Sequence, residues 1–349
     1  MKFFSTILLL TLVGTCATPK YTLKIKHLKE SVSLVDTSEV KKYSKTITAK
    51  ELSTQLYKFA SKEFQGRKAG EQGQKLAAEF LQSYYINEGI TSPFDDANYF
   101  QKITRPYLTN GIETTENVLA FIKGYEKPDE ILILSAHLDH LGKKDGNIYY
   151  GADDDGSGTV AIMEIAQAFN IAVANGYRPK RSILFIHFTA EEIGQIGSRF
   201  YVENPIFPLK NTIANLNIDM IGRIDNRHTH NKNYIYLIGS DRISKELHYV
   251  SEAVSKAYVD IDLDYTYNTL NDRNQYYSRS DHYKFAKRDI PVIFYFNGEH
   301  EDYHKHTDTP DKIDYELLEK RTRLIFSTAW QLINQEHRIV TDDNNLILN

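Results

Sequence analysis

The residues of this sequence that could do chemistry are histidines and carboxylates, and they occur in five short groups. The groups are Ala136-His-Leu-Asp139, Gly151-Ala-Asp-Asp-Asp-Gly-Ser-Gly158, Thr189-Ala-Glu-Glu192, Asn217-Ile-Asp-Met220 and Tyr303-His-Lys-His-Thr-Asp-Thr309. Imidazole nitrogens and carboxylate oxygens are donors for zinc, which takes four or five of them. One ion cannot use all five groups, and the surplus carboxylates would repel each other. The set therefore predicts two ions that share a carboxylate.

The elements that must position these groups alternate along the chain. Apolar runs predict strands at 117–123, 131–137, 182–188, 212–218, 234–238 and 291–296. Helical spacing of apolar residues predicts two helices within 48–89, separated by a loop at 66–70, and further helices at 156–169, 197–202, 244–258 and 315–334. This alternation predicts an α/β domain of three αβα layers, with a mostly parallel, mixed sheet and helices on both faces. The chemical groups follow strand ends, so the site is expected at the carboxyl edge of the sheet.

One stretch, His300-Glu-Asp-Tyr-His304, matches H-E-x-x-H, the zinc signature of single-metal endopeptidases. In those enzymes the motif lies inside a helix, which aims both imidazoles at one ion. Here Gly298 precedes the motif, a strand ends just before it, and Pro310 prevents a long helix after it. The match is interpreted as a coincidence within a loop. His304 is kept as a candidate ligand, and His300 and Glu301 are not.

The order H-x-D, G-A-x-D-x-x-S-G, E-E, D and H-x-x-x-D-T resembles that of the co-catalytic di-zinc aminopeptidases, family twenty-eight of the metallopeptidases. The resemblance covers the chain from about Glu51 to its C-terminal helix and implies a zinc-exopeptidase-like fold. It also implies a ligand set with a bridging carboxylate, Asp154, and four ligands of one ion each. His137 would bind one zinc, Glu192 would bind one ion only, Asp219 would serve the other, and His304 would complete the set.

Two further roles follow from the resemblance. Glu191 would be the general base, which accepts a proton from the attacking water and returns it to the leaving amine. Asp139 would orient the His137 imidazole, as metal-bound histidines usually require. The implied activity is an exopeptidase, with aminopeptidase first and dipeptidase or carboxypeptidase-like action also open. Manganese or cobalt could replace zinc on the same donors.

Two alternatives to this activity remain open. Glutaminyl cyclases resemble the same family but keep one zinc and perform an intramolecular aminolysis. Such enzymes lose part of the ligand set, whereas all five ligand positions occur here. The other alternative is a catalytically idle envelope lipoprotein that binds peptides. The Glu191-Glu192 pair argues against it, because a protein that only binds has no need of a base.

The N-terminal part of the sequence predicts export. Residues 1–17 combine a charged start with a short apolar run, as in a secretory signal, and Leu12-Val-Gly-Thr-Cys16 resembles the lipobox of bacterial lipoproteins. Lipidation of Cys16 is expected, with cleavage after Ala17 as the alternative, and the cell envelope or periplasm as the location. Residues 18–43 are expected to be a polar spacer, and 44–349 a single catalytic domain.

Composition limits the partners of the 349-residue chain. Its 42 basic and 46 acidic residues give a net charge of -4, so no overall positive field attracts nucleic acid. A peptide is the expected substrate, and contact with a membrane is expected only through Cys16. The sequence predicts no oligomeric state. The single cysteine excludes an intrachain disulfide, so the core and bound metal must stabilise the exported domain.

Overall fold

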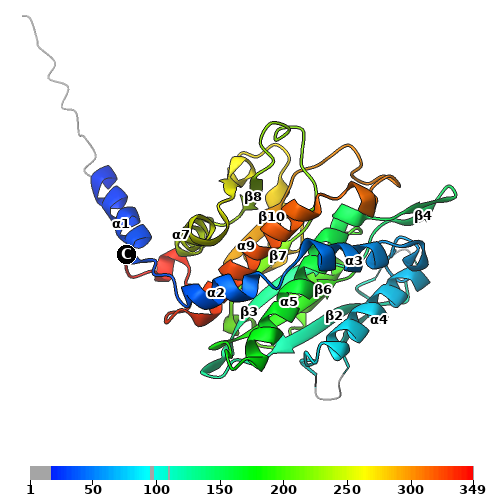
Figure 1. Cartoon of the computed structure of the whole chain (residues 1–349), viewed down its shortest axis with the longest axis horizontal. Helices are drawn as coiled ribbons and strands as arrows, with labels where there is room; N and C mark the ends of the chain where they lie inside the picture. Colours follow the sequence, from blue (N-terminus) through cyan, green and yellow to red (C-terminus); the bar gives the residue numbers. More distant parts are fainter. Residues whose placement is uncertain (1–16, 95–97, 109–110, 349) are drawn as a thin grey trace, which may run out of the picture.

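The centre of the molecule is an eight-stranded mixed sheet (Figure 1). This computed structural model describes residues 17–94, 98–108 and 111–348, so Cys16 and nearly all of the expected signal lie outside the described residues. The strands follow the order β1 Phe100–Thr104, β2 Thr114–Ile122, β6 Arg181–Phe188, β3 Lys127–His137, β7 Thr212–Ile218, β10 Val292–Phe296, β8 Tyr234–Ile238 and β9 Asp262–Asp264.

The four central strands, β6, β3, β7 and β10, are parallel to one another. On one side β2 pairs antiparallel with β6 and with β1, and on the other β8 pairs antiparallel with β10. The expected mixed, mostly parallel arrangement is confirmed for the strands that carry the chemical groups. Because their carboxyl ends meet at one edge, side chains that follow them gather there.

Helices cover both faces of the sheet, as expected. Alternate residues of β3 point to opposite faces, and Leu132 and Leu134 pack in one apolar cluster, whereas Ile131 and Ile133 pack in another. The first cluster includes residues of α3 Ala49–Phe59, α4 Gln72–Asn87, α5 Gly158–Ala174, α7 Lys245–Val254 and α9 Tyr315–Asn334. The second includes residues of α6 Ile196–Glu203 and α8 His282–Ala286.

Helix α5 is central to the first layer and opens directly after the aspartate-rich turn. By length and composition the stretch 152–174 could cross a membrane, but 72% of its apolar window is buried inside the molecule. Its packing against α3, α9 and β3 explains that hydrophobicity. The helix therefore serves as a core helix that holds the turn against the sheet.

The expected polar spacer is mostly helical. Residues 17–44 form α1 Ala17–Ser31 and α2 Thr37–Ser44, and Val40 and Tyr43 of α2 are buried. The Tyr43 ring stacks on Trp330 of α9 with centroids 5.7 Å apart. An eight-residue helix shows too little periodicity to be recognised, and its partner lies far along the chain. The folded unit thus begins before residue 44.

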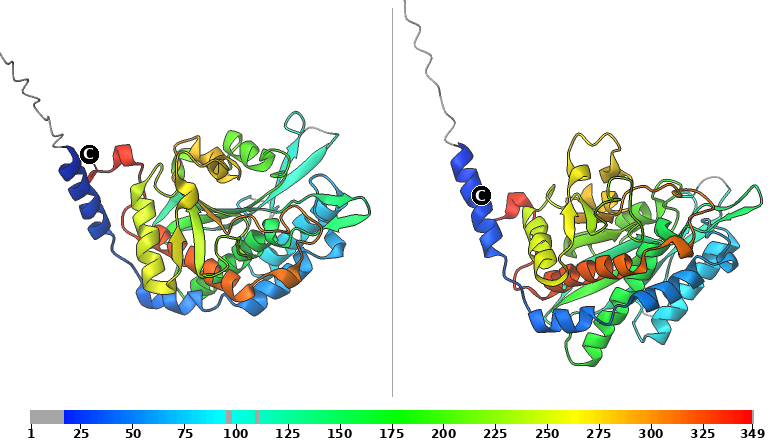
Figure 2. Two further views of the ribbon diagram at one scale, coloured as in Figure 1. Left: turned by 90° about the horizontal axis from the view of Figure 1, so that it is seen from above. Right: turned by 45° about the horizontal axis from the view of Figure 1, so that its top comes forward.

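The two ends of the described chain lie together. The Lys24 ammonium of α1 donates to the carbonyl oxygen of Leu348 (2.7 Å). Figures 1 and 2 show α1 and the C-terminus at one end of the molecule, and the hairpin of β4 Gly142–Lys144 and β5 Asn147–Tyr149 at the other. This hairpin and the edge strands β1 and β9 were not expected from the sequence.

Candidate metal centre

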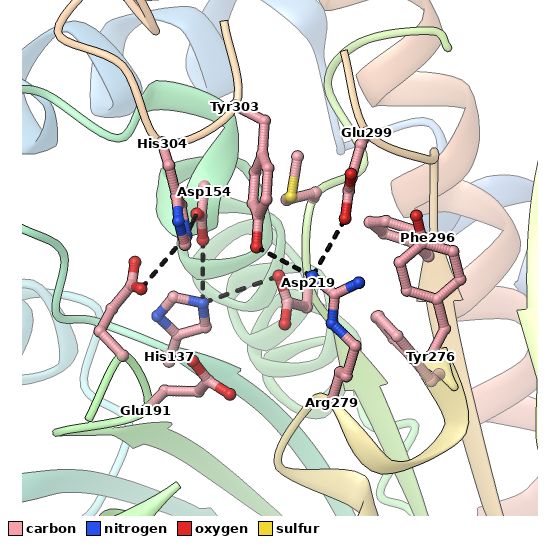
Figure 3. A pocket seen from close by; sticks show the side chains of 13 residues that line it. His137, Asp154, Glu191, Asp219, Tyr276, Arg279, Phe296, Glu299, Tyr303 and His304 are labelled. Atoms are coloured by element: carbon pink, nitrogen blue, oxygen red, sulfur yellow. Dashed lines mark hydrogen bonds and ion pairs between the residues drawn. The ribbon is translucent and has the colours of Figure 1, made fainter. Parts of the chain in front are cut away.

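The sheet brings together all seven side chains singled out from the sequence, and Figure 3 labels five of them: His137, Asp154, Glu191, Asp219 and His304. His137 is the last residue of β3, Glu191 and Glu192 follow β6, and Asp219 follows β7. Asp154 comes from the turn before α5, and His304 from the turn after β10. These six side chains line one pocket, and Asp139 lies directly behind it.

The two carboxylate oxygens of Asp154 face two different sets of donors. Its Oδ1 lies 3.2 Å from His137 Nε2, which lies 3.6 Å from Asp219 Oδ1. Its Oδ2 lies 3.1 Å from His304 Nε2, which lies 3.3 Å from Glu192 Oε2. Asp154 is therefore placed to be shared between two groups of ligands.

These separations suit zinc. At a metal–donor distance of about 2.0 Å, two donors of a tetrahedral site lie about 3.3 Å apart. The four donor–donor distances, from 3.1 to 3.6 Å, fall around that value. Imidazole and carboxylate without thiolate is also a donor set that zinc accepts. The residues present therefore fit a zinc centre with Asp154 as its common ligand.

Each of the two outer carboxylates has one oxygen held by the protein. Ser280 Oγ donates to Asp219 Oδ2 (2.6 Å), which leaves Oδ1 toward His137. His140 Nδ1–H donates to Glu192 Oε1 (2.7 Å), which leaves Oε2 toward His304. Both carboxylates are thus positioned to offer a metal ion one defined oxygen.

His140 was not predicted, although it stands three residues after His137. It is buried, and its Nδ1 lies 3.7 Å from Asp154 Oδ2, so it lies within reach of the second ligand group. Its position in the run that begins at His137 was a usable signal. Because Nδ1 is engaged by Glu192, the geometry favours a positioning role for His140 and leaves His304 as the ligand.

Asp139 acts differently from the expected carboxylate–imidazole hydrogen bond. His137 Nδ1–H donates to the backbone carbonyl of Asp139 (3.1 Å), and the carboxylate oxygen is 3.8 Å away. The tautomer with Nδ1–H leaves Nε2 as the free donor for a metal. The Asp139 carboxylate instead accepts the backbone N–H of Glu191 (3.0 Å). It fixes the start of the turn that carries Glu191 because the turns after β3 and β6 lie side by side.

Glu191 has the surroundings of a base. Its side chain lines the pocket beside His137 (Figure 3). Burial raises the pKa of Glu191 well above its usual range, although the nearby His137 opposes that effect. A carboxylate with a raised pKa accepts a proton more readily near neutral pH.

The turn that carries Asp154 is fixed by neighbouring carboxylates. Asp308 accepts the backbone N–H groups of Asp153 (3.0 Å) and Asp154 (3.2 Å). Asp155 accepts the N–H groups of His137 (3.0 Å) and Met220 (3.1 Å), so it joins the turn to β3 and to the end of β7. The second half of the H-x-x-x-D-T sequence thus builds the turn that supplies the shared ligand.

A buried arginine holds the same region from the other side. Arg67, in the loop between α3 and α4, is fully buried and donates to the carbonyl oxygens of Leu138 (2.8 Å), Tyr150 (2.7 Å) and Gly151 (2.8 Å). Gly151 is required there. Its φ is +54°, and a Cβ at this position would lie 2.2 Å from the Asp154 carbonyl oxygen.

The H-E-x-x-H stretch is a turn, in agreement with its interpretation as a loop. His300 Nε2 pairs with Asp153 (3.2 Å), and Glu301 pairs with Arg223 (3.2 Å). Neither side chain lines the metal pocket, whereas His304 does. His300 therefore supports the aspartate-rich turn from behind.

Beyond the ligands, the pocket has aromatic walls with one ion pair. Met220, Tyr276, Phe294 and Phe296 form the apolar part. Arg279 lies over the Tyr276 ring at 4.8 Å and pairs with Glu299 (3.0 Å). Figure 3 shows this pair beside Asp219.

Comparison with known proteins finds relatives in sequence and in fold. Probable glutamate carboxypeptidase VP8 of Zea mays is 38% identical over 104 residues, which are 30% of this chain and 14% of that protein. The chain thus spans a small part of that relative's length. Two solved structures share the fold. BSAP, a zinc aminopeptidase from Bacillus subtilis, is 16% identical over 83% of this chain and 96% of that chain, with a TM-score of 0.64.

The second structure, Porphyromonas gingivalis glutaminyl cyclase, is 17% identical over 81% of this chain and 98% of that chain, with a TM-score of 0.61. At these identities the likeness concerns the fold. The family model described as peptidase family M28 matches residues 117–329, a stretch that contains every candidate ligand. The chain therefore belongs to peptidase family M28.

Proposed function

We propose that this protein is a zinc-dependent exopeptidase that removes N-terminal residues from peptides, with two zinc ions bridged by Asp154. The observation that carries this proposal is that each Asp154 oxygen faces its own imidazole and carboxylate. A single-ion site has no use for a second complete set of donors. Membership of a peptidase family supports hydrolysis of peptides.

The residues of the chain divide the work of hydrolysis. Bound zinc would supply a Lewis acid and lower the pKa of a coordinated water. Glu191, beside His137, accepts the proton of the attacking water and returns it to the leaving amine. His137 and Asp219 would hold one ion and Glu192 and His304 the other, while His140 and Ser280 keep the carboxylates in place.

The lining of the pocket favours a free amino terminus. Five carboxylates line it, and its single arginine, Arg279, is paired with one of them, Glu299. Carboxylates at a closed end of a site stabilise a substrate ammonium group, and they disfavour a substrate carboxylate. The aromatic wall of Tyr276, Phe294 and Phe296 suits an apolar first side chain. These features support an aminopeptidase over carboxypeptidase-like action.

The export signal and lipid anchor are part of the proposal. Both rest on the sequence of residues 1–17, with Cys16 as the acylated residue. The enzyme would then act on peptides in the bacterial cell envelope. Labelling of the protein with a fatty-acid analogue in cells, with Cys16→Ser as the control, tests this part separately from catalysis.

The test of the function combines metal content with turnover. We expect about two zinc ions per chain and chelator-sensitive release from an aminoacyl-amide substrate. Glu191→Gln is expected to lower kcat by about 10²- to 10⁴-fold, because it removes the base. Its zinc content should stay unchanged, since Glu191 is not a ligand. About one zinc per chain, with cyclisation of N-terminal glutamine, would favour a glutaminyl cyclase. Normal peptide binding without turnover, in the unchanged protein and in Glu191→Gln alike, would favour a peptide-binding lipoprotein.

A further inference from the structure

A basic hollow lies at the edge of the sheet opposite the metal centre. It has a volume of about 670 Å³ and is lined by the segments that lead into β7 and β10 and by residues 338–341 and 344 near the C-terminus. Ile213, Ile290 and Ile339 are buried in its floor. The metal ligands follow the carboxyl ends of the same strands. Across the seven residues of β7 the two sites are about 20 Å apart.

Four cationic side chains line this hollow: Lys210, Lys287, Arg288 and Arg338. Among the described residues, none of the four has a carboxylate partner within 4 Å. One acidic residue, Asp289, also lines the hollow and is exposed. The hollow is therefore a local concentration of positive charge on a chain whose net charge is -4.

The arginine of this group is held in place without losing its charge. The Arg338 guanidinium donates to the carbonyl oxygens of Lys210 (3.4 Å) and Thr212 (3.2 Å) at the start of β7. Neutral acceptors fix its position and leave its positive charge uncompensated. Lys287 and Arg288 are exposed beside it. A fixed guanidinium surrounded by mobile cations suits phosphate oxygens.

The position of the hollow in the molecule indicates its binding partner. The C-terminal segment that lines it continues to Leu348, which accepts a hydrogen bond from Lys24 of α1. Helix α1 begins at Ala17, the residue after Cys16, which is the proposed site of acylation. The basic hollow is thus connected, through the C-terminal segment, to the end of the molecule at which α1 lies (Figure 2).

We propose that this hollow binds the headgroup phosphates of an anionic lipid bilayer and orients the protein with its metal centre facing away from the membrane. Clusters of lysine and arginine beside a membrane anchor bind anionic lipid, and each cation adds to the attraction. The metal centre lies on the opposite edge of the sheet, so peptides can reach it while the hollow is bound to lipid. This inference rests on the proposed membrane anchor at Cys16 and is independent of the proposed peptidase activity.

The test measures binding of the full chain to vesicles, with Cys16→Ser present in every form so that acylation contributes nothing. Binding to vesicles that contain phosphatidylglycerol is compared with binding to pure phosphatidylcholine, and the ratio isolates the charge-dependent part. We expect Lys287→Glu/Arg288→Glu to lower this ratio about tenfold or more. The matched control is Lys143→Glu/Lys144→Glu in the β4–β5 hairpin, which changes the net charge equally and should leave most of the preference intact.

Three results would overturn the proposal. The first is an unchanged ratio in the hollow variant, and the second is an equal loss in both variants, which would indicate only net charge. The third is loss of the preference in millimolar inorganic phosphate at constant ionic strength, which would indicate a site for a soluble phosphate ligand. Thermal unfolding of each variant confirms that a lost preference does not reflect a lost fold.

Discussion

The metal centre depends on individual side chains that are not themselves candidate ligands. Glu192 and Asp219 each have one oxygen engaged by a neighbour, His140 and Ser280 respectively. Without these neighbours the carboxylates could rotate, and the cost of ordering them would reduce the free energy of metal binding. Loss of such a neighbour typically weakens metal binding 10- to 100-fold.

His140→Asn tests this reasoning. The variant is expected to bind the zinc held by Glu192 and His304 about 10- to 100-fold less tightly, because Glu192 loses the hydrogen bond that positions it. Competition with a zinc-binding dye measures the affinity, and turnover at saturating zinc should remain close to that of the unchanged protein. His230→Asn, at an exposed position, is the control. Complete loss of one zinc at any concentration would instead identify His140 as a ligand.

Helix α5 carries a buried carboxyl group, that of Glu164, which is not part of the metal centre. Glu164 is 1% exposed, and neither carboxylate oxygen has a hydrogen-bond partner among the described residues. Burial, together with the nearby Glu51 of α3 and Glu88 after α4, raises the pKa of Glu164 to about 8. The layer of α3, α4 and α5 therefore tolerates this group in its protonated form and loses stability when it ionises.

The stability of this layer should consequently depend on pH. The folded pKa lies above the unfolded value of about 4.3, so the contribution of Glu164 to stability is fully present below that value. It is lost as the pH rises through about 8. Between these values the free energy of unfolding falls by at most about 1.4 kcal/mol per pH unit. Glu164→Gln should show a smaller fall in chemical denaturation, whereas the exposed Glu79→Gln should follow the unchanged protein. The same pH dependence of the free energy of unfolding in all three proteins would contradict this account.

The elements themselves were largely predictable from the sequence, whereas several contacts of the site were not. The central strands, helices α3 to α7 and helix α9 follow from apolar periodicity, because each buries a continuous face, whereas the five-residue helix α8 was not predicted. The position of the site followed from the residues after β3, β6 and β7. The packing of Tyr43 on Trp330 and the bonds from Asp308 to the Asp154 turn join residues far apart in sequence. No local pattern encodes such contacts, and Arg67 resembled any surface arginine until its burial was known.

The metal centre connects segments that lie far apart in the sequence and in different parts of the sheet. Its candidate ligands come from the ends of β3, β6 and β7, the turn before α5 and the turn after β10. Zinc at about 1,000 times its dissociation constant would stabilise the folded state by about 4 kcal/mol. For a chain of this size, removal of zinc by a chelator should lower the Tm by roughly 5–10 °C.

Calorimetry before and after dialysis against a chelator measures this change, and added zinc should restore the original Tm. The Asp154→Asn variant provides the comparison, since it weakens the ligand that both groups share. Its Tm should respond much less to the chelator. An unchanged Tm in the original protein would show that the ions are not coupled to folding.

The clamp formed by Arg67 has a consequence for protein engineering. The guanidinium that fixes the Leu138, Tyr150 and Gly151 carbonyls comes from residues that precede the 117–329 stretch shared with the family. A chimera that transplants this stretch alone would carry every candidate ligand but lose the group that sets their spacing. Recombination between relatives should therefore place its upstream junction before residue 62, so that the whole loop from Lys62 onward travels with the ligands.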